Sequence, residues 1–310
     1  MTVASIAAAL VPIAALLALG AALRRVRGFS DPAFWSGAER LAYFVLLPVL
    51  LFVNIATVDL AGVPLLRVSV AVVVPTVLVT GLLFVLHRVV APTPQAFTSV
   101  LQGSVRFNTY VGVSLAISIA PADGAALAGV VGAVLVPLVN IIATLGFEVF
   151  LVDKGSLLAL VRKIVLNPLV LACALGAVAG LLPVEAPEVV LAVLDPLAAA
   201  ALPVGLLCVG AGLTRIELRT HAVGVAVASV VKLLVLPALA LGALVLLGVS
   251  GPVALIALVF CSIGTASTSY VLARQLGGDA PLMAALIAFQ TVASFLTLPF
   301  VLTVGAAVLL

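Results

Sequence analysis

The sequence predicts an all-α polytopic membrane protein with ten transmembrane helices, and three observations lead to this fold class. First, 65% of the 310 residues are hydrophobic and 8% are charged, against about 25% charged in a typical soluble domain. Second, apolar runs of about 20 residues, enough to span a bilayer as a helix, recur along the chain. Third, these runs are apolar on all sides, whereas strands of membrane β-barrels alternate polar and apolar residues. A soluble enzyme is therefore excluded.

Apolar runs between charges and turn residues define the ten predicted spans. They cover residues 3–23, 33–56, 63–86, 97–119, 125–151, 160–182, 189–211, 221–247, 252–274 and 281–308. The first run has no basic residue before it and three arginines after it, which is the reverse of a secretory signal peptide. We therefore expect a retained helix whose N-terminus lies outside.

The basic residues support this orientation, because cytoplasmic loops of membrane proteins are enriched in Lys and Arg. With the N-terminus outside, the inside loops hold Arg24, Arg25, Arg27, Arg88, Lys154, Arg162, Lys163, Arg215, Arg219 and Arg274. The outside loops hold Arg67. Both termini are thus predicted to lie outside, and the net charge of +3 reflects topology rather than nucleic-acid binding.

The cysteines and histidines do not suggest a metal site or a cofactor. Cys173, Cys208 and Cys261 fall within apolar runs, where they are expected as small buried hydrophobic residues. His87 and His221 lie at loop edges with no second ligand at metal spacing. We expect no bound cofactor.

Prolines and glycines recur at matching positions, which indicates that the chain consists of two related halves. The matches are Pro12 and Gly20 with Pro168 and Gly176, Pro48 with Pro203, Pro75 with Pro237, Pro137 with Pro299, and Asn108-Thr109-Tyr110-Val111 with Thr268-Ser269-Tyr270-Val271. Because each half has an odd number of spans, the second half is inverted relative to the first. We predict one repeat at 1–152, a cytoplasmic connecting loop at 153–159 and the inverted repeat at 160–310. Inverted repeats are typical of secondary transporters.

The fourth and ninth spans are unusually polar for their depth and occupy corresponding places in the two halves. The fourth carries Arg106, Asn108, Thr109, Tyr110, Gly112 and Ser114, and the ninth carries Gly264, Thr265, Ser267, Thr268 and Ser269. Such paired segments indicate a binding site near the midplane of an inverted-repeat transporter, so these residues are the candidate substrate site. The alternative is that Ser, Thr and Gly only allow close helix packing or bond their own helix carbonyls.

The charges of these spans favour an anion. Helix halves that begin near the midplane point partial positive charge at a ligand, and Arg106 adds a full charge unless it snorkels to water. Lys232 lies deep in the eighth span, where a charge is costly without a partner. A secondary layer consists of Asn140, Lys232, Gln290, Thr291 and Ser294. The coupling ion, H⁺ or Na⁺, is left open.

At these residues the chain resembles the auxin efflux carrier family, which includes bacterial malonate-type transporters and plant PIN-type carriers, within the superfamily of bile-acid and arsenite carriers. The resemblance rests on Val11-Pro12 to Gly20, Leu47-Pro48 with Phe52, Asn108-Thr109-Tyr110-Val111-Gly112, Asn167-Pro168, Pro203 with Gly210 and Gly212, and Tyr270-Val271-Leu272-Ala273-Arg274-Gln275 with Gly277-Gly278-Asp279. The last stretch is the most specific signal.

The resemblance implies two inverted five-helix repeats whose fourth and ninth helices are broken and cross at the site, and often a homodimer. It also implies a mono- or dicarboxylate as the substrate, such as malonate or an auxin-like acid. We expect transport across the bacterial plasma membrane by an elevator-like movement of spans three to five and eight to ten. Many members carry a proline at each crossover. This chain instead has Gly112-Val113-Ser114 and Ser262-Ile263-Gly264, so we expect glycine to loosen these helices.

Other functions remain as alternatives at this point. Sodium-coupled uptake of larger amphipathic anions, as in the bile-acid branch, is the second transport hypothesis. A passive channel or a sensor is not excluded by composition. An intramembrane enzyme is not expected, because both histidines lie at loops and acidic or histidine clusters are missing. The predicted partners are the organic anion and membrane lipids.

Overall fold

The computed structural model describes residues 3–57, 63–151, 166, 168–181, 188–212, 221–266 and 268–310. Within these ranges the chain forms helices joined by short loops, and no strand is present. Six helices in these ranges are long and apolar enough to cross a membrane: Pro32–Thr57, Leu65–Val85, Gly124–Leu151, Val189–Ala211, Ala222–Leu246 and Ala280–Leu309. The prediction of an all-α, multi-pass membrane protein is therefore confirmed.

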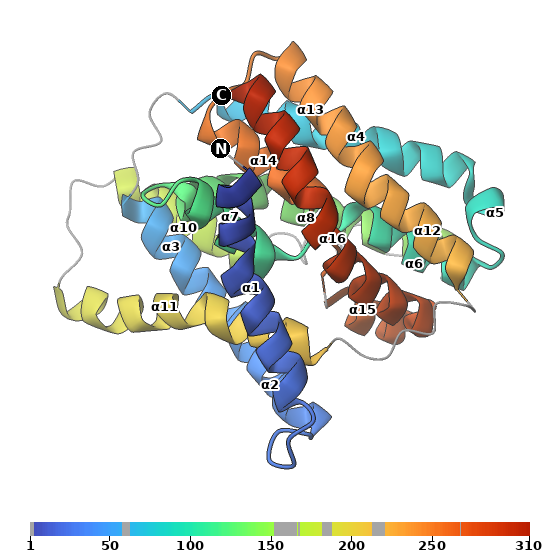
Figure 1. The fold of residues 1–310 in the computed structure, drawn as a ribbon, viewed down its shortest axis with the longest axis horizontal. Helices are drawn as coiled ribbons and strands as arrows, with labels where there is room; N and C mark the ends of the chain where they lie inside the picture. The colour runs from blue at the N-terminus through green and yellow to red at the C-terminus, as the bar shows by residue number, and fades with distance from the viewer. Residues whose placement is uncertain are drawn as a thin grey trace.

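The helices pack as two groups. One group, which we call the panel, occupies the lower left of Figure 1. It consists of α1 (Val3–Leu23), α2 (Pro32–Leu41), the π-helical turn η1 (Ala42–Leu46), α3 (Leu47–Thr57), α10 (Pro168–Leu181) and α11 (Glu188–Ala211). Within the panel, α3 packs most extensively on α10, and α1 packs most extensively on α11.

The second group, which we call the core group, holds both polar spans. It consists of α4 (Leu65–Val85), α5 (His87–Val90), α6 (Pro94–Val105), α7 (Thr109–Ile119), α8 (Gly124–Leu151), α12 (Ala222–Val230), the π-helical turn η2 (Val231–Val235), α13 (Leu236–Leu246), α14 (Pro252–Ser262), α15 (Thr268–Leu276) and α16 (Ala280–Leu309). In Figure 1, α4, α12 and α13 lie on the side away from the panel, and α7, α8, α14 and α16 lie between.

The predicted spans coincide with these helices to within a few residues over the part of the chain that is described. Corresponding helices also begin at a nearly constant separation: α6 and α14 begin at Pro94 and Pro252, α7 and α15 at Thr109 and Thr268, and α8 and α16 at Gly124 and Ala280. Several predicted features lie outside the described residues: the loop 153–159, Asn167, Ser267, and the basic residues Lys154, Arg162, Lys163, Arg215 and Arg219.

The fourth and ninth predicted spans are each interrupted, and neither interruption contains a proline. The first runs from Arg106 to Asn108, between α6 and α7, and the second begins at Ile263, between α14 and α15. The fourth span is interrupted before Gly112-Val113-Ser114 rather than at it, because Gly112 and Ser114 are helical residues of α7. The reason is that Asn108 caps α7, which starts the helix ahead of the glycine.

Glycine allows the backbones of the panel helices to touch. A Cβ atom added to Gly20 of α1 would lie 2.1 Å from the carbonyl oxygen of Leu207 in α11, and one added to Gly210 of α11 would lie 2.0 Å from that of Leu17 in α1. Small residues permit such close helix contacts in membranes. These two matched contacts hold α1 and α11 together as one unit.

Two long helices widen just before a proline. The N–H of Leu47 bonds the Ala42 carbonyl and that of Leu236 bonds the Val231 carbonyl, each five residues back. Pro48 and Pro237 follow immediately. Because a proline ring clashes with the carbonyl four residues earlier in an α-helix, the wider π-helical turn accommodates the ring without ending the helix.

Gly210→Ala is expected to destabilise the protein by about 1–3 kcal/mol, because the new methyl group would overlap the Leu17 carbonyl and push α1 from α11. Thermal unfolding in detergent checks this. Gly242→Ala in α13 is the control, since a Cβ there meets nothing within 4 Å. Equal melting temperatures for the two variants would contradict the backbone contact.

Candidate functional site

The first interruption is shaped by Arg106 and Asn108. The backbone of Arg106 is extended, with φ −71° and ψ 161°, so α6 ends at Val105. The side-chain oxygen of Asn108 accepts hydrogen bonds from the backbone N–H groups of Tyr110 (3.1 Å) and Val111 (3.3 Å). Asn is among the best N-cap residues, so this side chain starts α7 in the interior of the protein.

The two interruptions bond directly to each other. The backbone N–H of Asn108 donates to the carbonyl oxygen of Gly264 at 2.9 Å, and the Arg106 guanidinium donates to the hydroxyl oxygen of Thr268 at 3.2 Å. Gly112 also faces the second half, since a Cβ there would lie 3.0 Å from the ring of Phe260. The corresponding polar segments therefore meet, as the sequence predicts for a shared site.

Gln290 of α16 connects the same two segments. Its side-chain oxygen accepts from the backbone N–H of Thr265 at 3.0 Å, and its side-chain nitrogen donates to the Gly103 carbonyl at 2.9 Å. A Cβ at Gly264 would lie 2.9 Å from the Gln290 backbone, so only glycine fits at this approach. Gln290 thus pairs with backbone groups beside both interruptions. Its predicted place in a secondary layer did not indicate this bridging role.

Lys232 reaches the crossing from η2. The side chain is fully buried, and its Nζ donates to the Phe260 carbonyl at 3.1 Å. Nζ also lies 5.8 Å from the centre of the Phe107 ring, within the range of a cation–π interaction. Phe107 belongs to the first interruption and Phe260 to the end of α14, so Lys232 touches both halves.

Buried polar atoms without a hydrogen-bond partner gather at the first interruption. They belong to Gln102, Arg106, Asn108, Tyr110, Ser114 and Ser229. In Arg106 two guanidinium nitrogens, Nε and one terminal nitrogen, lack partners, and in Asn108 the amide nitrogen does. Buried polar groups are normally satisfied, so a concentration of unpaired donors in one place indicates a site that a polar ligand completes.

The remaining candidate residues divide into those at the crossing and those away from it. Thr109 is half-buried in the first turn of α7, and the hydroxyl groups of Thr265 and Ser269 lie 3.3 Å apart. Thr291 and Ser294 donate to carbonyls of their own helix, Ile287 and Thr291. This agrees with the alternative in which such hydroxyl groups only bond carbonyls of their own helix. Asn140 lies half-buried in α8, outside both interruptions.

Sequence reasoning missed Gln102 and Ser229. Gln102 is fully buried in α6, four residues before Arg106, and both of its amide atoms lack partners. Ser229 lies three residues before Lys232 in α12 and is also unpaired. Their helical spacing was the signal that could have found them. Residues three or four apart share a helix face, so Gln102 shares one with Arg106 and Ser229 shares one with Lys232.

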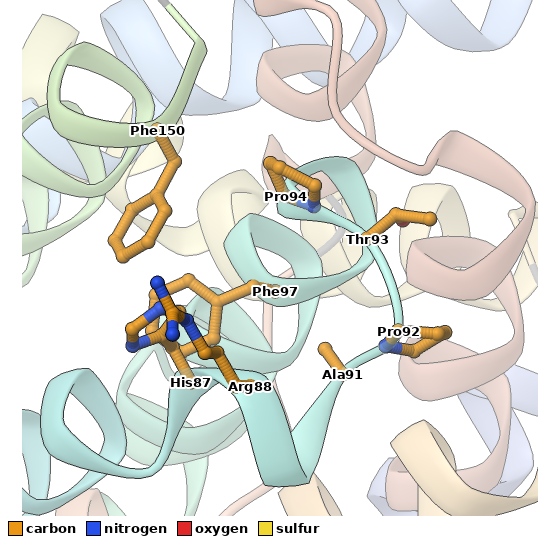
Figure 2. Close-up of a pocket in the computed structure, with 8 residues that line it drawn as sticks. All are labelled: His87, Arg88, Ala91, Pro92, Thr93, Pro94, Phe97 and Phe150. Atoms are coloured by element: carbon orange, nitrogen blue, oxygen red, sulfur yellow. The ribbon is translucent and has the colours of Figure 1, made fainter.

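Two cavities lie away from the crossing. One of about 290 Å³ is lined by His87, Arg88, Ala91, Pro92, Thr93, Pro94, Phe97 and Phe150, where α5 leads into α6 near the end of α8. Figure 2 shows His87 and Phe150 beside each other there. A second of about 400 Å³ is lined mostly by apolar residues of α3, α8 and α10. Neither cavity includes a candidate site residue.

Comparison with protein families gives one match, to the family described as "Membrane transport protein", over residues 154–302. Residues 154–302 of the chain are similar to this family. The matched range contains the second interruption, with Gly264, Thr265 and Thr268. No curated protein matches the chain.

This match supports the resemblance to the auxin efflux carrier family. The family match and the several long apolar helices identify the chain as an integral membrane transport protein of the auxin efflux carrier type. The family is one of transporters rather than enzymes.

Gln290→Leu is expected to destabilise the protein by about 1–3 kcal/mol, because the N–H of Thr265 would be left buried and unpaired. Thr291→Val is the control, since the Thr291 hydroxyl bonds only the Ile287 carbonyl of its own helix. Thermal unfolding of both variants in detergent tests the bridge. A Gln290→Leu variant as stable as Thr291→Val would contradict it.

Proposed function

We propose that the protein is a secondary active transporter that moves a small organic anion, a mono- or dicarboxylate, across the bacterial plasma membrane. The observation that carries the proposal is the set of unpaired donors at the first interruption, two guanidinium nitrogens of Arg106 and the amide nitrogen of Asn108. A carboxylate is acceptor-only, and its hydrogen bonds with a guanidinium are charge-assisted. It is therefore the ligand that best satisfies these groups.

The local electrostatics also favour an anionic ligand. The N-terminus of α7, at Asn108 and Thr109, points partial positive charge into the crossing. Arg106 adds a full positive charge two residues earlier. Helix N-termini bind anions readily, and a charged donor makes stronger hydrogen bonds than a neutral one.

The architecture supports alternating access. Corresponding helices of residues 1–152 and 160–310 begin at a nearly constant separation and meet at the crossing, as expected for two inverted five-helix repeats joined by the loop 153–159. The start of α1 and the end of α16 lie at the same end of the molecule in Figure 1, which fits an even number of crossings and both termini outside.

The division into panel and core group supports an elevator-like movement. The panel helices touch through backbone at Gly20 and Gly210, whereas panel and core group meet through side chains at Gly205 and Gly129. A Cβ at Gly205 would lie 2.2 Å from the Tyr110 ring, and one at Gly129 2.7 Å from Ile55. Side-chain contacts repack more easily than backbone contacts, so the core group would carry the substrate. We also propose a homodimer in membrane lipid, with no bound cofactor.

Ligand-induced thermal stabilisation tests the substrate class. A ligand that binds only the folded protein raises the melting temperature by mass action. We expect a shift from at least one of malonate and indole-3-acetate, each measured in sodium and in potassium buffer at two pH values. Shifts from neutral or cationic compounds alone would contradict an anion carrier, and shifts confined to sodium buffer would favour the sodium-coupled branch.

Arg106→Gln is expected to weaken carboxylate binding by about tenfold or more, because the charged donor contributes about 1.5–3 kcal/mol. Arg106→Lys should restore the charge but not the planar set of donors, and so bind with intermediate affinity. Arg40→Gln, at an exposed position in α2, is the control. Wild-type affinity in Arg106→Gln would remove Arg106 from the site.

Asn108→Asp separates the two tasks of Asn108. The carboxylate still accepts from the Tyr110 and Val111 N–H groups, so α7 stays capped, but the unpaired donor is replaced by negative charge. We expect near-normal thermal stability with loss of carboxylate binding. Thr268→Ala, which removes the acceptor that orients Arg106, should also weaken binding. Unchanged binding in both variants would argue against the crossing as the site.

A further inference from the structure

The two helices that precede the interruptions, α6 and α14, each end with a carbonyl that accepts a hydrogen bond from a side chain of another helix, but the two donors differ in charge. In α6 the carbonyl of the third residue from the end, Gly103, accepts from the Gln290 amide at 2.9 Å. In α14 the carbonyl of the third residue from the end, Phe260, accepts from Lys232 Nζ at 3.1 Å. One helix end is thus capped by a neutral group and the other by an ammonium group.

Two contacts of Lys232 favour its positive charge. The C-terminal end of α14 carries partial negative charge, which stabilises a cation, and the face of the Phe107 ring adds a second favourable contact. The side chain is fully buried, and a buried charge in a membrane protein is a strong indication of function. The two partners described here, the Phe260 carbonyl and the Phe107 ring, contain no acidic group.

We infer that Lys232 is a built-in cation that takes the place of a bound coupling cation at the crossing. In carriers with discontinuous helices, Na⁺ is held by unwound carbonyls and by the C-terminal ends of half-helices. In this chain the ammonium group occupies such an end, between the first interruption and α14. The inference rests on the proposed transport function, and its consequence is that substrate binding requires no sodium.

The position of Lys232 in the π-helical turn η2 makes this arrangement possible. Successive residues of a wider turn point in different directions from those of an α-helix, which is why such turns recur at functional sites. Here the turn carries Lys232 to the Phe260 carbonyl across the interface between α12–α13 and α14. The charge therefore belongs to the protein rather than to solution, and it stays at the site through every cycle.

The first experiment uses the wild-type protein and malonate as the probe. We expect the malonate-induced rise in melting temperature to be the same in sodium, potassium and N-methylglucamine chloride. A rise that requires sodium would overturn the inference. This test of the sodium requirement needs no variant, so it applies even where substitutions at Lys232 prevent folding.

The second experiment replaces the charge chemically. Lys232→Ala removes a group equivalent to n-propylammonium. Adding n-propylammonium should therefore raise the melting temperature of this variant, while adding the neutral isostere 1-propanol should not. Gln290→Ala, the variant at the neutral helix end, is the control and should gain nothing from n-propylammonium. An equal response of both variants, or rescue by 1-propanol, would overturn the inference.

The third measurement links the charge to binding. Lys232→Met keeps the apolar stem and removes the charge, and we expect malonate to bind about tenfold more weakly or worse. Wild-type affinity in this variant would overturn the inference. Failure of the wild type to bind any carboxylate would instead refute the proposed function, whereas rescue by n-propylammonium requires no substrate and reports on Lys232 alone.

Discussion

An interruption in a membrane helix leaves backbone N–H and C=O groups that lipid cannot satisfy, and the arrangement of this protein follows from that constraint. The two interruptions cross, and the N–H of Asn108 bonds the Gly264 carbonyl. Side chains complete what the backbones leave: Gln290 bonds to both segments and Lys232 bonds the end of α14. The Asn108 N–H and the Gly103 carbonyl depend on the second half, and the Gly264 carbonyl depends on the first, so the two interruptions partly satisfy each other.

This mutual dependence explains why unpaired groups are informative here. Most of the backbone at the crossing is satisfied by specific partners, so the donors left over on Arg106 and Asn108 stand out against a well-bonded background. A protein that builds such a crossing and leaves charged donors unpaired has a destabilised interior. Binding of an acceptor ligand relieves that cost, which couples substrate affinity to the packing of both halves.

The sequence predicts the helices well because apolar runs and charges are local signals: the span predicted at 125–151 is observed as Gly124–Leu151. It also predicts the paired polar segments, since Asn108 and Thr268 are recognisable in their own spans. The position of the first interruption and the role of Gln290 depend on contacts between residues distant in the chain. No local pattern indicates which carbonyl Gln290 or Lys232 reaches, and the unpaired state of Gln102 is visible only in three dimensions.

The two π-helical turns have a further consequence, because they do not lie in equivalent helices of the two halves. The turn before Pro237 has no counterpart at Pro75, where α4 stays regular, and the turn before Pro48 has none at Pro203 in α11. A carrier that works by exchanging the shapes of its halves would need equal halves for its two end states to have equal free energy. Under the proposed alternating access, unequal halves give the two end states different free energies, and the empty protein populates one of them in excess.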